Sequence, residues 1–214
     1  TTSIHQHGFS GAFRVIAGSS LHTDYRFQVH RRLDDRASVG EVHSSGMRLL
    51  RSGDVVPIRS GPEGLTHALF HLDNPSVTLV ARTIQDAGAG PQYELFKPGI
   101  SLDAPWARAD ARLTMMRRWL AVCADLGNAS ADESIMERVL ALDFAGLCSI
   151  LLEHGRFLGV DRPGSSFLPR LEECHPGLSS YMVEAFRFSR SQESLAAVRR
   201  DVDDPELRYF VALL

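Results

Sequence analysis

Several features are scarce in this 214-residue sequence, and each absence argues against a class of protein. No run of about 18 apolar residues occurs, so we expect no membrane-spanning helix. Neither sign of charge dominates, because the formal net charge is only -3, and the chain has no electrostatic reason to bind nucleic acid or an anionic membrane. No secretory signal is visible. We therefore expect a cytoplasmic globular protein that binds neither nucleic acid nor a membrane.

Cysteine is also scarce, since Cys123, Cys148 and Cys174 are the only three. Their odd number and wide spacing predict reduced thiols, as in cytosolic proteins, and lack the close spacing of a zinc knuckle. Cys174 precedes His175, but a nucleophilic cysteine and its histidine base are usually distant in sequence. A cysteine nucleophile is therefore not favoured.

The chain changes character near residue 103, which predicts an α+β protein with a β-barrel over residues 1–103 and a helical domain over residues 104–214. Before this point, short runs of β-branched and aromatic residues alternate with turns, as in barrels and sandwiches. The expected strands are Phe13–Ala17, Tyr25–Val29, Met47–Leu50, Val55–Ile58 and Val77–Thr83. The expected breaks are at Gly18, Gly40, Gly46, Gly53, Gly61 and Gly64.

After residue 103, apolar residues recur at steps of three and four, which is the helical period. This spacing predicts a helix over residues 109–126, with Arg117 and Arg118 in solvent and Trp119 buried. The other expected boundaries are a stop at Gly127, a cap at Ser130 or Asp132 for a helix reaching Leu142, a cap at Asp143 and a stop at Gly155 for the next helix, and first helical turns at Pro176 and Pro205. We expect these helices to cover one side of the barrel, gate its mouth or form a homodimer contact.

Both ends suggest that further segments belong to the native protein. The chain stops within the apolar run 210–214, which is unusual for a surface terminus, and its most informative motif begins at residue 5. We therefore expect the barrel to lack its first strands in this chain.

That motif is His5-Gln6-His7. Residues two apart on a strand point to the same face, so the two imidazoles can reach one ion together. A third ligand is available at His67, which follows a turn containing Pro62 and Gly64. Neutral imidazole suits several divalent metals, so the histidines alone do not name the metal.

These residues resemble the two motifs of the cupin superfamily, in which a His-x-His pair and a closing glycine are followed by Pro-x-Gly-x-x-His-x-x-x-Asn. Gly18 matches the closing glycine; Pro62, Gly64 and His67 match the second motif, and His71 stands at the Asn position. The resemblance covers roughly residues 1–100. It implies a small β-barrel that holds one divalent metal ion on His5, His7 and His67.

The sequence departs from the cupin pattern at the glutamate, where Gly11 or Ala12 stands. The resemblance then implies a three-histidine site, as in the thiol dioxygenases and related non-heme Fe(II) dioxygenases, with open positions for substrate and dioxygen. The thiol dioxygenases also carry a Ser-His-Tyr set, and Thr78, Val80 and Arg82 occupy those positions here. A thiol substrate is therefore in question.

Four further residues are candidates near the metal. Arg82 could clamp a substrate carboxylate or phosphate, or simply reach solvent from the end of its strand. Tyr25 could pack in the core or donate a hydrogen bond to a ligand, and Tyr93 could edge the barrel mouth. His71 could act as a second-shell partner or a substitute ligand. We interpret the other histidines of the barrel half, His22, His30 and His43, as structural.

Three functions remain open at this point. The first is a metal-dependent oxygenase that acts on a small polar molecule, with Fe(II) as the expected ion and Arg82 and Tyr25 as substrate contacts. The second is an isomerase or lyase that uses zinc or manganese on the same scaffold, and nickel would also suit the ligands. The third is a cupin that binds or senses a small ligand without turnover. Fold alone does not choose among them, because one fold supports many functions.

Overall fold

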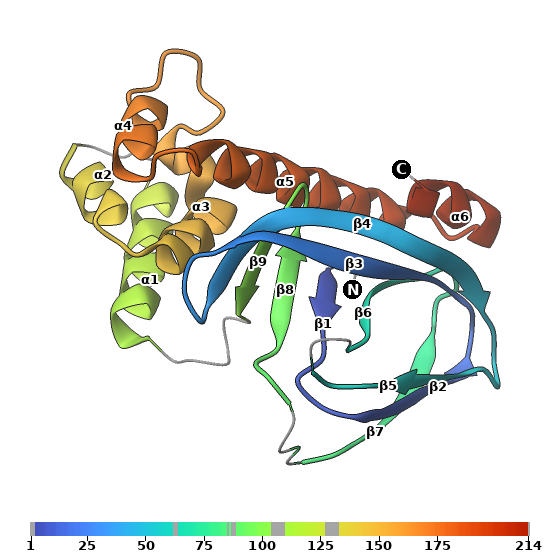
Figure 1. Cartoon of the computed structure of the whole chain (residues 1–214). Helices are drawn as coiled ribbons and strands as arrows, with labels where there is room; N and C mark the ends of the chain where they lie inside the picture. Colours follow the sequence, from blue (N-terminus) through green and yellow to red (C-terminus); the bar gives the residue numbers. More distant parts are fainter. Residues whose placement is uncertain are drawn as a thin grey trace.

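The computed structural model describes residues 3–61, 64–84, 86, 89–103, 110–126 and 133–213, and nine strands precede six helices within these ranges (Figure 1). This arrangement confirms the α+β class. The strands are β1 (Ile4–Gln6), β2 (Gly11–Ala17), β3 (Ser20–Arg32), β4 (Ala37–Leu50), β5 (Val55–Ile58), β6 (Thr66–His71), β7 (Val77–Arg82), β8 (Tyr93–Phe96) and β9 (Ile100–Asp103). The helices are α1 (Ala111–Asp125), α2 (Glu133–Leu140), α3 (Phe144–Leu158), α4 (Phe167–Cys174), α5 (Ser179–Asp201) and α6 (Pro205–Leu213).

Six strands form a closed antiparallel barrel in the order β1-β6-β3-β4-β9-β8. The other three form a sheet in the order β5-β2-β7. Buried and exposed side chains alternate along β2, so one face of the strand packs inward: Phe13 and Val15 are buried while Arg14 and Ile16 are exposed. The buried pair packs with Val56, Ile58 and Leu50, which fastens this small sheet to the end of β4.

A larger apolar core lies where the helices meet the barrel. It joins Val39 of β4 and Ile100 of β9 to buried side chains of every helix from α1 to α5. Helix α3 supplies more of them than any other helix and is apolar on nearly all sides, as expected of a helix surrounded by other elements. The core is therefore shared between the strands and the helices.

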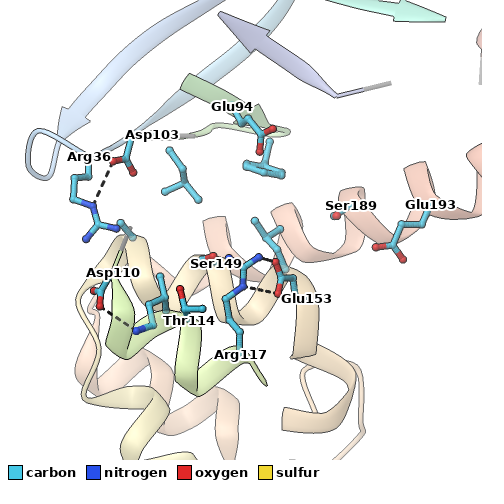
Figure 2. A pocket seen from close by; sticks show the side chains of 15 residues that line it. Arg36, Glu94, Asp103, Asp110, Thr114, Arg117, Ser149, Glu153, Ser189 and Glu193 are labelled. Atoms are coloured by element: carbon cyan, nitrogen blue, oxygen red, sulfur yellow. Dashed lines mark hydrogen bonds and ion pairs between the residues drawn. The ribbon is translucent and has the colours of Figure 1, made fainter. Parts of the chain in front are cut away.

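Charged residues connect the two halves at the edge of this core (Figure 2). Arg36, in the turn between β3 and β4, pairs with Asp103 at the end of β9 and with Asp143, at 3.6 Å and 3.0 Å. Asp143 also caps α3, because its Oδ1 accepts a hydrogen bond from the Gly146 backbone N–H. A cavity of about 220 Å³ lies beside these groups. Arg117 of α1 and Glu153 of α3 both line it, and Arg117 donates a hydrogen bond to Glu153.

Most predicted strands match the structure. Four of the five fall within observed strands, and the fifth ends one residue early, at Arg82. The predicted breaks at Gly40 and Gly46 are wrong, because β4 runs through both. Gly40 serves close packing instead, since a Cβ there would lie 2.0 Å from the Gln28 carbonyl oxygen.

The predicted helix boundaries agree with the structure only in part. Asp143 caps α3 and Pro205 begins α6 as expected, but Pro176 precedes the start of α5 by three residues. The predicted stop at Gly155 is wrong: α3 continues to Leu158 and ends at Gly159, whose φ of 80° suits glycine. The predicted boundaries at residue 109, Gly127, Ser130 and Asp132 lie outside the described residues.

The expected burial of Trp119 is also wrong. Its side chain is 41% exposed, because Leu120 occupies the inward position of that turn and is fully buried. Among the described helices, none is both long enough and apolar enough to span a membrane.

Candidate metal centre

Two neighbouring barrel strands bring the predicted histidines together. His5 on β1 is the direct cross-strand partner of His67 on β6, so both side chains lie on the same face of the sheet. His7 follows the end of β1 by one residue. Each of the three offers one donor nitrogen, and these nitrogens all lie within 4.8 Å of one another. We call His5, His7 and His67 the three-histidine cluster.

The donor atoms of the cluster point at one another. The Nε2 atoms of His7 and His67 are 2.9 Å apart. Two ligand nitrogens about 2.1 Å from one ion would be about 3.0 Å apart if they met it at a right angle. His5 directs its Nδ1 to the Ser3 carbonyl oxygen, at 3.1 Å, which leaves its Nε2 available. This arrangement fits a single ion.

A fourth histidine supports the cluster from behind. His22 on β3 is fully buried, and its Nε2 lies 2.8 Å from Nδ1 of His67. The Arg48 Nε–H donates a hydrogen bond to Nδ1 of His22 at 3.4 Å, and the Asp24 carboxylate lies 3.6 Å from the same nitrogen. For His67 to bind a metal through Nε2, its proton must sit on Nδ1 and point to Nε2 of His22. The proton of His22 would then sit on its Nδ1 and point to Asp24, in place of the hydrogen bond from Arg48.

Burial keeps the cluster uncharged. Desolvation and the neighbouring His5 lower the pKa of His7 to about 4. Desolvation, followed by the charges of the surrounding histidines and Arg48, lowers the pKa of His67 to about 2. The pKa of His5 is lowered by burial too. At neutral pH all three imidazoles are therefore in the form that binds metals.

A side-chain hydrogen bond holds β1 beside the turn that leads into β6. The Gln6 side chain donates a hydrogen bond to the Gly61 carbonyl oxygen at 2.7 Å, and the Gly64 backbone N–H donates to the same oxygen at 2.9 Å. Gly61 has a φ of 90°, which favours glycine. Pro62, the first residue of the predicted second motif, lies outside the described residues.

A large cavity opens next to the cluster. Its volume is about 1070 Å³, and its lining includes His7, Asp24 and further residues of the β3–β4 hairpin. Arg26 and Arg32 are the cationic lining residues within the described part of the chain, and Asp24 is the anionic one. Uncharged polar side chains, among them Gln6 and two tyrosines, also line the cavity. The cavity is therefore suited to a polar molecule.

The other predicted site residues occupy different positions. Tyr25 and Tyr93 both line the cavity, and burial raises the pKa of Tyr25. Arg82 is exposed on β7 and stacks over Phe9, with its Cζ 5.1 Å from the ring centroid. Phe9 in turn contacts the His7 ring at 4.7 Å between centroids. Arg82 is thus one aromatic ring away from the cluster.

His71 lies four residues along β6 from His67, or about 13 Å at 3.3 Å per residue. Its Nδ1 lies 2.7 Å from the Ser20 hydroxyl. This placement gives no support to a ligand role.

Comparison with protein-family models, curated proteins and solved structures finds no significant match to this chain. A closed β-barrel with a three-histidine cluster is compatible with the cupin resemblance.

Sequence reasoning missed His22 and Asp24 as parts of this site. Neither has motif spacing relative to the other histidines. The signal that could have found them is the alternation of β3, where Ser20, His22 and Asp24 share one face.

Proposed function

We propose that this chain is a metal-dependent enzyme of the cupin type that binds one divalent ion on His5, His7 and His67. The observation that carries the proposal is the convergence of three donor nitrogens within 4.8 Å beside a cavity of about 1070 Å³. A metal held only for structure needs no substrate-sized space next to it. Catalytic metal sites do, because the substrate must reach the open positions.

The donor set narrows the choice of ion. Three neutral imidazoles suit Fe(II), Zn, Ni and Cu, whereas Mg and Ca favour oxygen ligands. We propose Fe(II), as in the three-histidine dioxygenases that the sequence resembles, and an oxygenase reaction on a small polar molecule. When bound, iron would supply Lewis acidity and one-electron redox chemistry.

The chain itself would bind and orient the substrate. Arg26 and Arg32 give the cavity a positive balance over Asp24, which favours a substrate with a carboxylate or another anionic group. Tyr25 remains protonated at neutral pH, because burial raises its pKa, and it can donate a hydrogen bond to that substrate. Arg82 remains a candidate contact for a substrate that extends past Phe9.

The test begins with metal content. The protein is loaded anaerobically with Fe(II), desalted, and analysed beside His67→Ala and the control His43→Ala, whose imidazole is exposed and pairs with Glu41. We expect about one iron per chain in the wild type and His43→Ala, and far less in His67→Ala. Equal iron in all three proteins would overturn the proposed ligand set.

The second step tests the chemistry. Iron-loaded protein is screened for oxygen uptake with small carboxylates, amino acids and hydroxy acids. We expect at least one compound to stimulate uptake in the wild type and not in His67→Ala. If the site instead retains zinc or manganese on purification and no compound stimulates uptake, the oxygenase assignment fails and an isomerase or lyase assay follows.

A further inference from the structure

Helix α1 carries an apolar stripe on its outer face. Met115 is 70% exposed, Trp119 41%, Val122 54% and Leu126, at the C-terminal cap, 76%. These four residues, which we call the α1 stripe, are separated by four, three and four positions. That is the a/d spacing of a helix that packs against another helix along one seam.

The α1 stripe is distinct from the face that holds α1 in the fold. Leu120 is fully buried, and Leu113, Met116 and Cys123 pack on the same core from the inward side. Arg117 lines the cavity of about 220 Å³ between the barrel and the helices and binds Glu153 there (Figure 2). The helix therefore has one apolar face that the chain covers and a second one that it leaves exposed. Contiguous exposed apolar residues of this kind mark interaction surfaces.

The α1 stripe is complementary to the same stripe on a second copy of the chain. Suppose that two copies of α1 pack antiparallel about a two-fold axis, with Trp119 of each copy opposite Val122 of the other. Met115 then lies opposite Leu126 of the second copy, so every member of the stripe meets a member of the same stripe. An isologous interface requires this self-complementarity.

The same alignment places Arg118 opposite Asp125. Both residues are exposed and lie on one flank of the stripe, directly before Trp119 and Leu126. In an antiparallel helix pair the flanking residues that precede the a positions meet each other, so Arg118 of each copy reaches Asp125 of the other. Two ion pairs of opposite sign result, and a parallel arrangement would not form them.

We infer that the α1 stripe is a homodimer interface, in which two copies of this chain pair antiparallel through α1 and are held in register by reciprocal Arg118–Asp125 ion pairs. A helix of 15 residues is about 22 Å long, so the helix pair alone buries an area near the lower limit for a specific interface. The dimer should therefore dissociate on dilution in the micromolar range. The proposal does not depend on metal or on the proposed reaction.

The interface leaves the small sheet uncovered. Figure 1 shows α1 on the side of the molecule opposite β2, β5 and β7. The lining of the 1070 Å³ cavity includes no residue of α1. Dimerisation through α1 therefore does not need to close that cavity.

The test is sedimentation of the whole chain over a wide concentration range. Arg118→Asp places like charges at both reciprocal ion-pair positions and should weaken the dimer about tenfold. The double variant Arg118→Asp with Asp125→Arg restores opposite charges in the swapped order and should recover wild-type affinity. Trp119→Glu should give a monomer at every concentration, and circular dichroism with thermal melting should show each variant folded, because these side chains lie on the surface.

A monomer at all concentrations for the wild type would overturn the inference. So would a dimer that survives Trp119→Glu, because the interface would then lie elsewhere. A dimer weakened by Arg118→Asp but not restored by the charge swap would overturn the antiparallel register. Arg187→Asp is the matched control, since Arg187 is exposed on α5 and pairs with Glu184, three residues before it on the same helix.

Discussion

Nε2 of His22 lies 2.8 Å from Nδ1 of His67, and both side chains are almost completely buried. The contact fixes the orientation of the His67 ring and assigns its two nitrogens to different partners. One nitrogen faces the support and the other faces the cluster. Metal-binding histidines commonly have such a partner behind them, which holds the tautomer that leaves the donor lone pair free.

Removing that partner should weaken metal binding without removing a ligand. We expect His22→Phe to reduce affinity for Co(II) or Fe(II) by about 10- to 100-fold, because the His67 ring loses its orientation and its preferred tautomer. Chelator competition measures the change, and thermal melting confirms the fold. His43→Ala, at an exposed position, should bind like the wild type. Unchanged affinity in His22→Phe would show that His22 only fills space.

The metal-free protein should lose stability as the pH falls. The pKa of a histidine is about 6.5 in the unfolded chain but is lowered to about 4 for His7 and to about 2 for His67 in the fold. The unfolded state therefore binds more protons below pH 6.5. The free energy of unfolding should fall from pH 6.5 towards pH 4, by up to about 1.4 kcal/mol per pH unit for His67. His7 should contribute less, because it is partly exposed and solvent screens its charge.

Urea denaturation with chelator at pH 7, 6 and 5 measures this slope. Carboxylates also titrate towards the lower end of the range, so the informative quantity is the difference between proteins. His67→Gln should show a shallower slope than the wild type over the same interval. Parallel slopes in the two proteins would show that His67 is not the buried neutral group that its surroundings imply.

The sequence was most informative where local chemistry decides the structure. The spacing of His5 and His7 and the cupin-like motif that contains His67 predicted three histidines whose donor nitrogens lie within 4.8 Å of one another. The His5–His7 pair follows from strand alternation, which depends on adjacent residues alone. The capping of α3 by Asp143 was predictable for the same reason. The His5–His7 spacing and the Asp143 cap need no knowledge of distant parts of the chain.

The sequence was uninformative where distant elements meet. Glycines at positions 40 and 155 look like breaks, but the first lies under a neighbouring strand and the second under Phe186. His22 has no motif spacing and becomes part of the site only through the pairing of β3 with β6. Tertiary contacts override local signals at these positions.

The link between barrel and helices should depend on Arg36. Its guanidinium pairs with the buried Asp103 and with Asp143, so Arg36→Ala leaves a buried carboxylate with less compensation. We expect a loss of roughly 1–3 kcal/mol in the free energy of unfolding, measured by urea denaturation. Arg187→Ala should cost little by comparison, because an exposed pair three residues apart contributes only a few tenths of a kcal/mol. Similar losses in the two variants would show that the Arg36 network is no stronger than a surface pair.

Gly155 provides a test of helix packing against helix propensity. Within an exposed helix, Gly→Ala would stabilise by about 1 kcal/mol. A Cβ at Gly155, however, would lie 2.6 Å from Cε2 of the buried Phe186. We therefore expect Gly155→Ala to destabilise the protein by roughly 1–3 kcal/mol, as overpacking does. The double variant Gly155→Ala with Phe186→Leu removes the clashing ring edge, so it should be more stable than the sum of the two single changes predicts. Additive losses would mean that the cost of Gly155→Ala does not come from its contact with Phe186.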